Sequence, residues 1–323
     1  MCAGHRLPQS ITAPSASTSP RVAAAVLGIV LALVTSKPTL ADEGGNSLYL
    51  PGMFGSLAAA PGEPGWSLAF VYYAYGGKLN LNTIGSIAER QDMVYGALNY
   101  TFKQPVLGGQ LAVGVASATG RAWAQIAGGF EDSRWGFNDV VPSAALRWNN
   151  GVHNWMVYAE TEITVGTYNA ARLANFGIGH SGFDGGAGYT YFDPKTGNEF
   201  TAVAGLTYNT KNPSTNIQSG IDAHIDWAAS KFLRKDFQIG LVGYYFQQLT
   251  ADRDQPFFLG DFKSRVAAVG PQIGYLFPAG HLQGYLNLKH YWEFAAQNRP
   301  EGWNTWVVLS FSPKAGDEAI LGR

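Results

Sequence analysis

Three titratable side chains occupy every second position of one short segment, at Asp222, His224 and Asp226. Successive side chains of a β-strand point to opposite faces, so these three share one face if the segment is a strand. A histidine between two carboxylates can serve acid–base chemistry or bind a metal ion. The structural alternative is that the histidine and the carboxylates satisfy one another inside the protein. Glu160 and Glu162 show the same two-residue spacing.

A serine nucleophile activated by a histidine base is the second chemistry to consider. On a strand, the two residues must lie two positions apart to share a face. None of the five histidines after residue 41 has a serine two residues after it: His153, His180, His224, His281 and His290. His180 and Ser181 are immediate neighbours and would point to opposite faces. The spacing of zinc ligands is also absent, so the sequence predicts neither an enzyme nor a cofactor.

The segments around these residues alternate apolar and polar side chains. Between 217 and 227, one face carries Ile217, Ile221, Ala223, Ile225 and Trp227. Between 282 and 294, Leu282, Leu286, Leu288 and Trp292 alternate with Gln283, Asn287, Lys289 and Glu293. A period of two over a dozen residues excludes an amphipathic helix, whose period is 3.6.

Similar segments predict twelve strands: 66–75, 91–102, 111–127, 139–148, 154–163, 183–192, 200–208, 217–227, 237–248, 265–277, 282–294 and 303–311. Asn149-Asn150-Gly151 predicts a tight hairpin turn. Short connections alternate with longer outer ones, such as 128–134, 166–179 and 251–261. An even strand number with this asymmetry is typical of bacterial outer-membrane barrels. We therefore expect an all-β fold, a transmembrane antiparallel up-and-down barrel of about 12 strands.

Composition favours this barrel over a soluble β-sandwich. Hydrophobic residues make up 46% of the chain, yet its mean hydropathy is -0.05 and only 14% of residues are charged. A soluble domain carries about 25% charged residues. Aromatic residues near predicted strand ends suit the girdles at membrane interfaces, namely Trp66, Tyr208, Trp227, Trp292 and Trp303.

Strand alternation predicts that seven ionisable side chains line the lumen: Glu160, Glu162, Asp222, His224, Asp226, Lys289 and Glu293. On the lipid face a charge costs about 2–4 kcal/mol at the bilayer midplane. Inside, these groups either hold the wall rigid through ion pairs or line a permeation path. An undetected β-bulge would invert the facing of the residues beyond it.

The N-terminus has the pattern of an export signal. Basic residues precede the apolar stretch 22–34, and small residues allow cleavage after Ala41. About thirteen apolar residues are too few for a membrane-spanning anchor. Cleavage removes Cys2 and leaves 19 basic against 23 acidic residues, a balance that does not favour nucleic acid. The predicted organisation is therefore a signal peptide (1–41), a lead-in or small plug (42–65), the barrel (66–311) and a C-terminal tail (312–323).

The connection after Ala251 contains an apolar cluster. Phe257, Phe258 and Phe262 could form an exposed patch that captures a hydrophobic solute. Contact of the loop tips with lipopolysaccharide, or with one another, explains these residues equally well.

Several stretches resemble one known family. They are 52–59 (GMFGSLAA), 61–66 (PGEPGW), 240–250 (GLVGYYFQQLT), 269–271 (VGP), 291–294 (YWEF) and 298–302 (NRPEG). In this combination and order they resemble the outer-membrane proteins of the meta-pathway of phenol degradation. The resemblance covers nearly the whole mature chain and implies an outer-membrane barrel, often considered a transporter for aromatic or other hydrophobic compounds. In one departure, Phe311 is not the last residue, whereas such barrels often end on a terminal aromatic.

The sequence therefore predicts a bacterial outer-membrane channel or transporter that takes up small aromatic or other hydrophobic compounds. Its expected partners are outer-membrane lipid, lipopolysaccharide, the solute and the barrel-assembly machinery. The interior of a twelve-stranded barrel is intermediate in width between that of an eight-stranded barrel, which side chains fill, and that of a sixteen-stranded porin, which holds an open channel. This width favours a narrow or plugged pore. The alternatives are a structural or adhesive barrel without transport and an outer-membrane lipid hydrolase.

Overall fold

The computed structural model describes residues 47–81, 85–127, 129–254 and 263–314, all of which belong to one compact unit. The predicted signal peptide (1–41), the loop residues Phe257, Phe258 and Phe262, and most of the predicted tail lie outside the described residues. Among the residues described, no helix is both long and apolar enough to cross a membrane.

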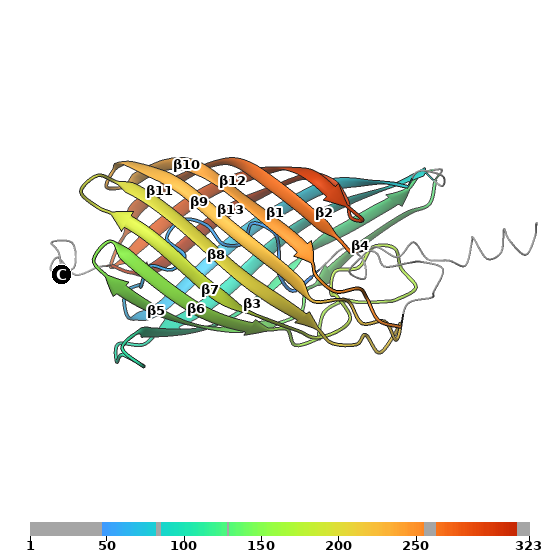
Figure 1. Cartoon of the computed structure of the whole chain (residues 1–323), viewed down its shortest axis with the longest axis horizontal. Coiled ribbons are helices and arrows are strands. Elements are labelled where there is room, and N and C mark those ends of the chain that lie inside the picture. The colour runs from blue at the N-terminus through green and yellow to red at the C-terminus, as the bar shows by residue number, and fades with distance from the viewer. Residues whose placement is uncertain (1–46, 82–84, 128, 255–262, 315–323) are drawn as a thin grey trace, which may run out of the picture. The chain divides into compact units, whose positions relative to one another are not determined.

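The described residues form thirteen strands (Figure 1). They are β1 (Gly65–Leu81), β2 (Gly85–Thr101), β3 (Gln110–Ile126), β4 (Glu131–Phe137), β5 (Val141–Asn150), β6 (His153–Thr161), β7 (Gly182–Asp193), β8 (Asn198–Asn209), β9 (Asp222–Arg234), β10 (Phe237–Gln248), β11 (Arg265–Ala279), β12 (Leu282–Gln297) and β13 (Glu301–Pro313).

All strand pairings are antiparallel, and the sheet closes on itself because β1 pairs with both β2 and β13. Strand β3 pairs with β5 along residues 110–116 and with β4 along residues 119–125. β4 and β5 therefore share one position in the ring. The ring has twelve positions, which confirms the predicted barrel.

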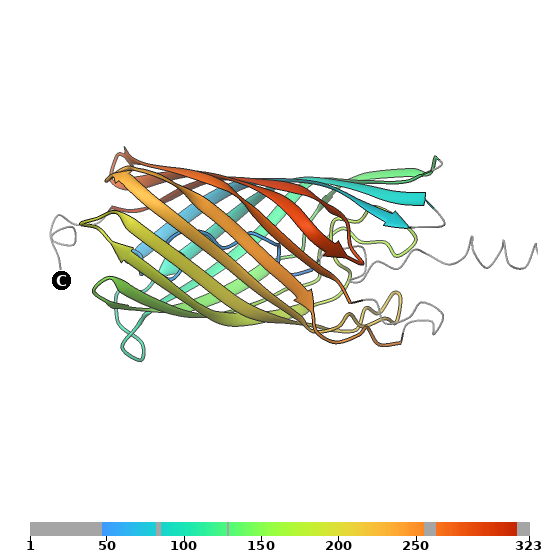
Figure 2. The ribbon, with the colours of Figure 1, turned by 45° about the horizontal axis from the view of Figure 1, so that its top comes forward.

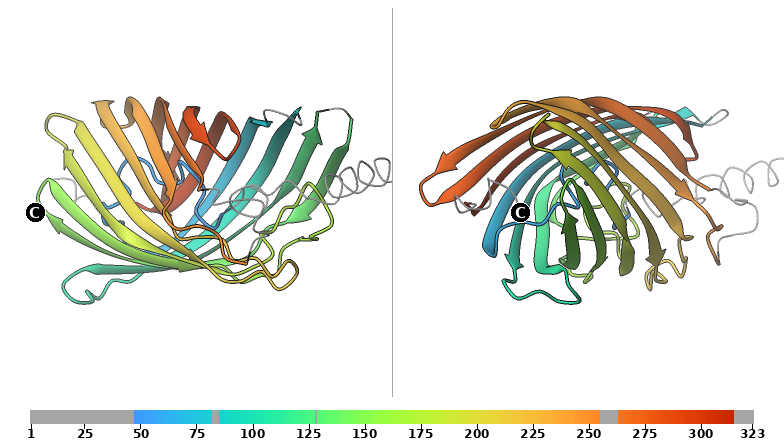
Figure 3. Two further views of the ribbon diagram at one scale, coloured as in Figure 1. Left: turned by 45° about the vertical axis from the view of Figure 1, so that its right-hand side comes forward. Right: turned by 60° about the vertical axis from the view of Figure 1, so that its left-hand side comes forward.

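The interior and exterior of the wall follow the predicted alternation. On β1, Trp66, Leu68, Phe70 and Tyr72 are exposed on the outer surface. On β9, Ile225 is exposed while its neighbours His224 and Asp226 are buried. A closed sheet leaves no unpaired edge in lipid, and its apolar outer face meets the hydrocarbon. Figures 2 and 3 show the strands inclined around the lumen.

The prediction that residues 128–134 form a connection was wrong, because β4 begins at Glu131. Two side-chain hydrogen bonds hold β4 to β3: the indole N–H of Trp123 donates to Glu131 at 2.6 Å, and the guanidinium of Arg121 donates to Ser133 at 2.7 Å. The charged composition of β4 concealed a strand at the outer end of the wall. Its alternation appears only at Trp135 and Phe137, which both face outward.

The start of β9 also differs from the prediction, since the strand runs from Asp222 to Arg234 rather than from 217 to 227. The backbone at Gly220 lies so close to Thr250 that a Cβ atom there would be 1.9 Å from the Thr250 carbonyl oxygen. The segment before Asp222 bonds instead to the neighbouring connection, through Gln218 and Arg253. Trp227 consequently lies within β9 and not near its end.

The lipid-facing surface yields a stability prediction at Leu241, which lies in the middle of β10 and is 53% exposed. We expect Leu241→Arg to lower the free energy of unfolding in lipid vesicles by about 2–4 kcal/mol, because the charge enters hydrocarbon. Urea titration followed by tryptophan fluorescence measures this change. Leu241→Ile is the control and should remain close to the wild type; equal stability of the two variants would contradict a lipid-facing position.

Candidate functional site in the barrel lumen

Residues 47–64, here called the lumenal segment, contain no strand and run inside the barrel (Figures 1 and 2). Two clusters of buried apolar side chains hold the segment against the wall. The first joins Tyr49 to Phe246, Tyr291 and Trp306, and the second joins Ala59 to Met156, Tyr158 and Val203. The segment therefore packs along the interior as part of the fold.

Asp226 of β9 binds the first part of the lumenal segment, at Tyr49 and Gly52. The Tyr49 hydroxyl donates to one Asp226 carboxylate oxygen at 2.8 Å, and the backbone N–H of Gly52 donates to the other at 3.0 Å. Burial, followed by the charge of Asp226, raises the pKa of the Tyr49 hydroxyl, which keeps it protonated as a donor. Gly52 has a φ of 88°, and a Cβ there would be 2.9 Å from the Tyr291 ring. The turn therefore requires glycine.

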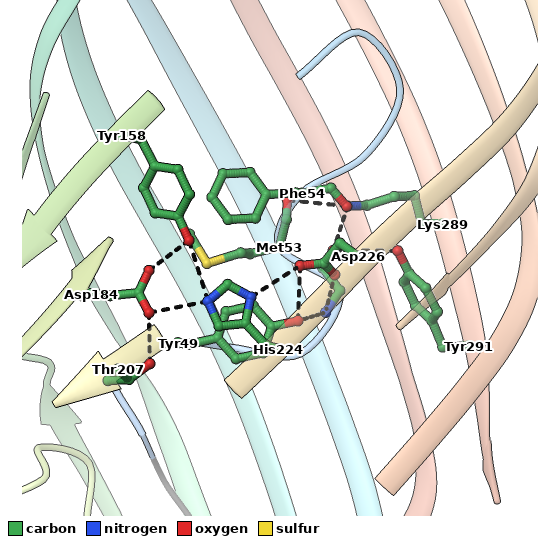
Figure 4. A network of polar contacts seen from close by, with 11 residues as sticks. Tyr49, Met53, Phe54, Tyr158, Asp184, Thr207, His224, Asp226, Lys289 and Tyr291 are labelled. Carbon is green, nitrogen blue, oxygen red and sulfur yellow. Dashed lines mark hydrogen bonds and ion pairs between the residues drawn. The ribbon is translucent and has the colours of Figure 1, made fainter. Parts of the chain in front are cut away.

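Lys289 of β12 binds the carbonyl side of the same turn (Figure 4). Its ammonium donates to the carbonyl oxygen of Gly52 at 2.6 Å and reaches those of Met53 and Phe54 at 3.3 and 3.5 Å. The ammonium also lies 5.1 Å from the centre of the Trp306 ring. Asp226 and Lys289 thus bind the two polar sides of one turn, which fixes its position between β9 and β12.

His224 is held from three sides. Its ring stacks on Tyr49, with 3.6 Å between ring centres, and its Nε2 atom lies 3.0 Å from Asp184 and 3.2 Å from the Tyr158 hydroxyl. Its Nδ1 atom is 3.9 Å from Asp226 and makes no hydrogen bond. The acid–base constellation anticipated in the sequence is therefore assembled around the lumenal segment, and this supports the structural alternative.

Asp184 of β7 completes this network. It accepts hydrogen bonds from Tyr158 at 2.7 Å and from Thr207 at 2.6 Å, in addition to its contact with His224. Gly205 lies beside these groups, and a Cβ there would be 2.2 Å from the Tyr158 hydroxyl and 2.5 Å from Nε2 of His224. A residue with a side chain at this position would displace the network, so the neighbouring strand requires glycine here.

A second set of contacts, which the sequence analysis missed, holds the later part of the lumenal segment, from Ser56 to Ala58. The Ser56 hydroxyl donates to Glu199 at 2.9 Å and lies 2.8 Å from the Ser230 hydroxyl. Glu199 also accepts the backbone N–H of Leu57 at 3.1 Å, and Arg147 donates to the Ala58 carbonyl at 3.1 Å. The alternation of Glu199 with its apolar neighbours could have placed it inside, but nothing in the pattern identified its partner.

The remaining predicted lumen residues lie elsewhere in the interior. Asp222 accepts a hydrogen bond from Asn209 at 3.0 Å, and Glu293 accepts bonds from Tyr244 and from the Gly302 backbone, both at 2.8 Å. Glu160 and Glu162 line a cavity, and Glu160 lies opposite Asp184 where β6 pairs with β7. The structure thus brings together Asp226, His224 and Lys289 but not the other four, and their part in permeation stays a prediction.

The cavity has a volume of about 220 Å³ and lies between the lumenal segment and the wall formed by β1, β2, β3, β5, β6 and β13. Its lining is largely apolar and includes Val71, Met93, Ala97, Ala116, Phe176 and Trp306. An apolar cavity of about 150 Å³ is large enough to bind benzene in another protein. This cavity can therefore hold a small aromatic compound.

The segment 162–181, here called the outer loop, contributes Phe176 and Ile178 to the cavity and is bound by two carboxylates. Asp139 accepts the backbone N–H groups of Val165 at 2.8 Å and Gly166 at 2.5 Å. Asp132 accepts those of Leu173 and Ala174, both at 3.1 Å. Carboxylates that accept several backbone hydrogen bonds hold a loop firmly, so the outer loop is a fixed part of the cavity wall.

No group of three or more histidine, cysteine or acidic side chains within the described ranges could hold a metal ion. His224 lies among Asp184 and Asp226, but Asp184 already accepts bonds from Tyr158 and Thr207, and Asp226 from Tyr49 and Gly52. The arrangement can position the lumenal segment and neutralise its polar backbone.

The anchoring of the lumenal segment can be tested at Lys289. We expect Lys289→Met to speed amide exchange at Gly52 and Leu57 by about tenfold to a hundredfold, because a hydrogen bond to a charged group contributes about 1.5–3 kcal/mol. Hydrogen–deuterium exchange of the folded barrel measures this effect. The control is Lys211→Met, which removes an exposed ion pair with Asp254; unchanged exchange in both variants would show that Lys289 does not hold the segment.

Comparison with known proteins gives both a family and a fold. Residues 88–309, more than half of the chain, match the family described as "Putative MetA-pathway of phenol degradation". No curated protein matches the chain. The COG4313 outer membrane channel from Pseudomonas putida F1 is similar in structure, with a TM-score of 0.68 and 12% identity over 78% of this chain and 97% of that one. This likeness shows a shared fold.

Two further solved structures overlap with the chain at lower scores. The β-domain of the Bordetella autotransporter BrkA has a TM-score of 0.46 and 11% identity, over 77% of this chain and 100% of that one. The CymD monoaromatic hydrocarbon channel has a TM-score of 0.35 and 8% identity, over 77% and 87%. By its closed sheet and apolar exterior the protein is a barrel of the bacterial outer membrane, and by its sequence it belongs to the phenol-degradation MetA-pathway family.

Proposed function

We propose that this protein is an outer-membrane channel that takes up small aromatic or other hydrophobic compounds, and that the cavity beside the lumenal segment is a station on their path. The observation that carries the proposal is a largely apolar cavity of about 220 Å³ inside the barrel, next to the lumenal segment. Family membership and the shared fold with a solved outer-membrane channel support it.

The position of the cavity supports a path that leaves the anchors of the lumenal segment in place. The anchors Asp226, Lys289 and Glu199 come from β9, β12 and β8. The cavity is lined instead by β1, β2, β3, β5, β6 and β13, and none of the three anchors is among its lining residues. A solute can therefore occupy the cavity without breaking the hydrogen bonds that fix the segment, which serves as a plug that narrows the lumen.

Binding and passage in this proposal require no covalent chemistry. His224 and Asp226 contact the lumenal segment, and Asp184 bonds to the wall.

We further propose lipopolysaccharide and the barrel-assembly machinery as partners and cleavage of a signal peptide after Ala41. The residues Phe257, Phe258 and Phe262 remain a proposed capture site for the solute at the outer surface.

The test is the conductance of the purified barrel in a planar bilayer, with and without phenol. We expect current steps that phenol blocks, because a bound aromatic molecule narrows the path. Ala97→Trp fills the cavity and should abolish the block by phenol. The matched control is Leu98→Trp on the next residue of β2, which faces lipid and should leave the block unchanged.

Two other outcomes would each contradict a part of the proposed function. A folded barrel that neither conducts nor binds phenol would contradict the channel and favour a structural or adhesive barrel. If phenol blocks the current equally in both variants, solutes pass through the barrel but do not use this cavity.

A further inference from the structure

The apolar cavity contains polar atoms that have no partner. The side-chain oxygens Oε1 of Glu160, Oε2 of Glu162 and Oδ1 of Asn138 are buried and accept no hydrogen bond, and the Ser47 hydroxyl is unpaired as well. Glu162 is only 3% exposed. The amide oxygen of Asn138 only accepts hydrogen bonds, and the glutamate oxygens only accept them once their carboxyl groups are ionised. The cavity therefore presents an unmet demand for hydrogen-bond donors.

The surroundings of the two glutamates supply no cation. No lysine, arginine or histidine lines the cavity, and within the part of the chain described, no basic side chain forms an ion pair with Glu160 or Glu162. The charged groups that act on them are further acids: Asp184 acts on Glu160, and Asp139 acts on Glu162 and also shares a side-chain hydrogen bond with it. This side of the lumen is therefore acidic throughout.

Both neighbouring acids are already engaged. Asp139 accepts backbone N–H groups of the outer loop, and Asp184 accepts the hydroxyls of Tyr158 and Thr207. Glu160 lies in β6 and Glu162 directly follows its last residue, and both side chains line the cavity. A buried acceptor without a donor is unfavourable, and more so if it is charged. A ligand that brings a donor to this place recovers that free energy.

We propose that the cavity selects small apolar compounds whose polar end donates hydrogen bonds, with a protonated amine preferred over an alcohol or phenol and a carboxylate rejected. The apolar body lies against Val71, Met93 and Trp306, and the donor end lies against Glu160, Glu162 and Asn138. An ammonium group offers three donors and a positive charge, whereas a carboxylate offers none and is repelled. The inference rests on the proposed function and names its substrate class.

Three probes of one size and different polar ends test this selectivity: benzylamine, benzyl alcohol and benzoate. The full barrel in lipid nanodiscs is titrated by calorimetry, with empty nanodiscs as the reference for partition into lipid. At neutral pH we expect benzylamine to bind at least about tenfold more tightly than benzoate, with benzyl alcohol between them, because the ammonium group donates charge-assisted hydrogen bonds and benzoate offers only acceptors.

Variants at the glutamates assign the preference to this cavity. Glu162→Gln and Glu160→Gln keep the side-chain shape but replace an acceptor by an amide donor, so each should weaken benzylamine binding by about tenfold and improve benzoate binding. The matched control is Glu63→Gln, which lies at the entrance to β1 and does not line the cavity. Mobility of unheated samples on denaturing gels verifies that each variant folds.

The outcomes separate this inference from the proposed function. Equal binding of benzylamine and benzoate, or tighter binding of benzoate, overturns the selectivity even if phenol blocks the conductance. If none of the probes binds, the unpaired oxygens are satisfied by water only and the selectivity is also overturned. Absence of conductance contradicts the channel but leaves the binding preference to be judged from calorimetry alone.

Discussion

The structure depends on one constraint: within a bilayer no water is available to satisfy backbone N–H and C=O groups, so the sheet must close. Closure reverses the arrangement of a soluble protein. Apolar residues such as Leu241 and Ile225 face lipid, and charged or polar residues such as Asp226, His224 and Lys289 lie in the interior. A lumen filled by protein becomes an interior in which polar and charged side chains are buried. Every charge in it then needs a partner.

The lumenal segment and the wall satisfy one another. An irregular chain inside the barrel brings backbone groups that no strand pairs, and buried groups of this kind require hydrogen bonds. Asp226 accepts the N–H of Gly52, Lys289 donates to three carbonyls, and Glu199 accepts the N–H of Leu57. The charges of the wall thus stabilise the segment, and the segment neutralises the polarity of the wall. The acidic cavity lies where some buried polar atoms have no hydrogen-bond partner.

The ring of strands could be predicted from the sequence because a period of two reports directly which side of a strand meets lipid. Strand ends were less predictable: β4 has too much charge to be recognised, and the start of β9 depends on a close approach between Gly220 and Thr250. Alternation placed Asp226 and Lys289 inside but could not pair them with Gly52, because their partners are backbone groups without a sequence signature. The cavity depends on packing between distant segments and had no signal at all.

The contacts of the lumenal segment impose an order on biogenesis. Tyr49 bonds to a residue 177 positions later in the chain, and Lys289 reaches back 237 positions to Gly52. These contacts cannot form until β9 and β12 have been made, yet the seam between β1 and β13 closes around the same segment. A ring that encloses the lumenal segment must either receive this segment before the seam is sealed or admit it afterwards. The lumenal segment is therefore among the last parts of the described chain to reach its native place.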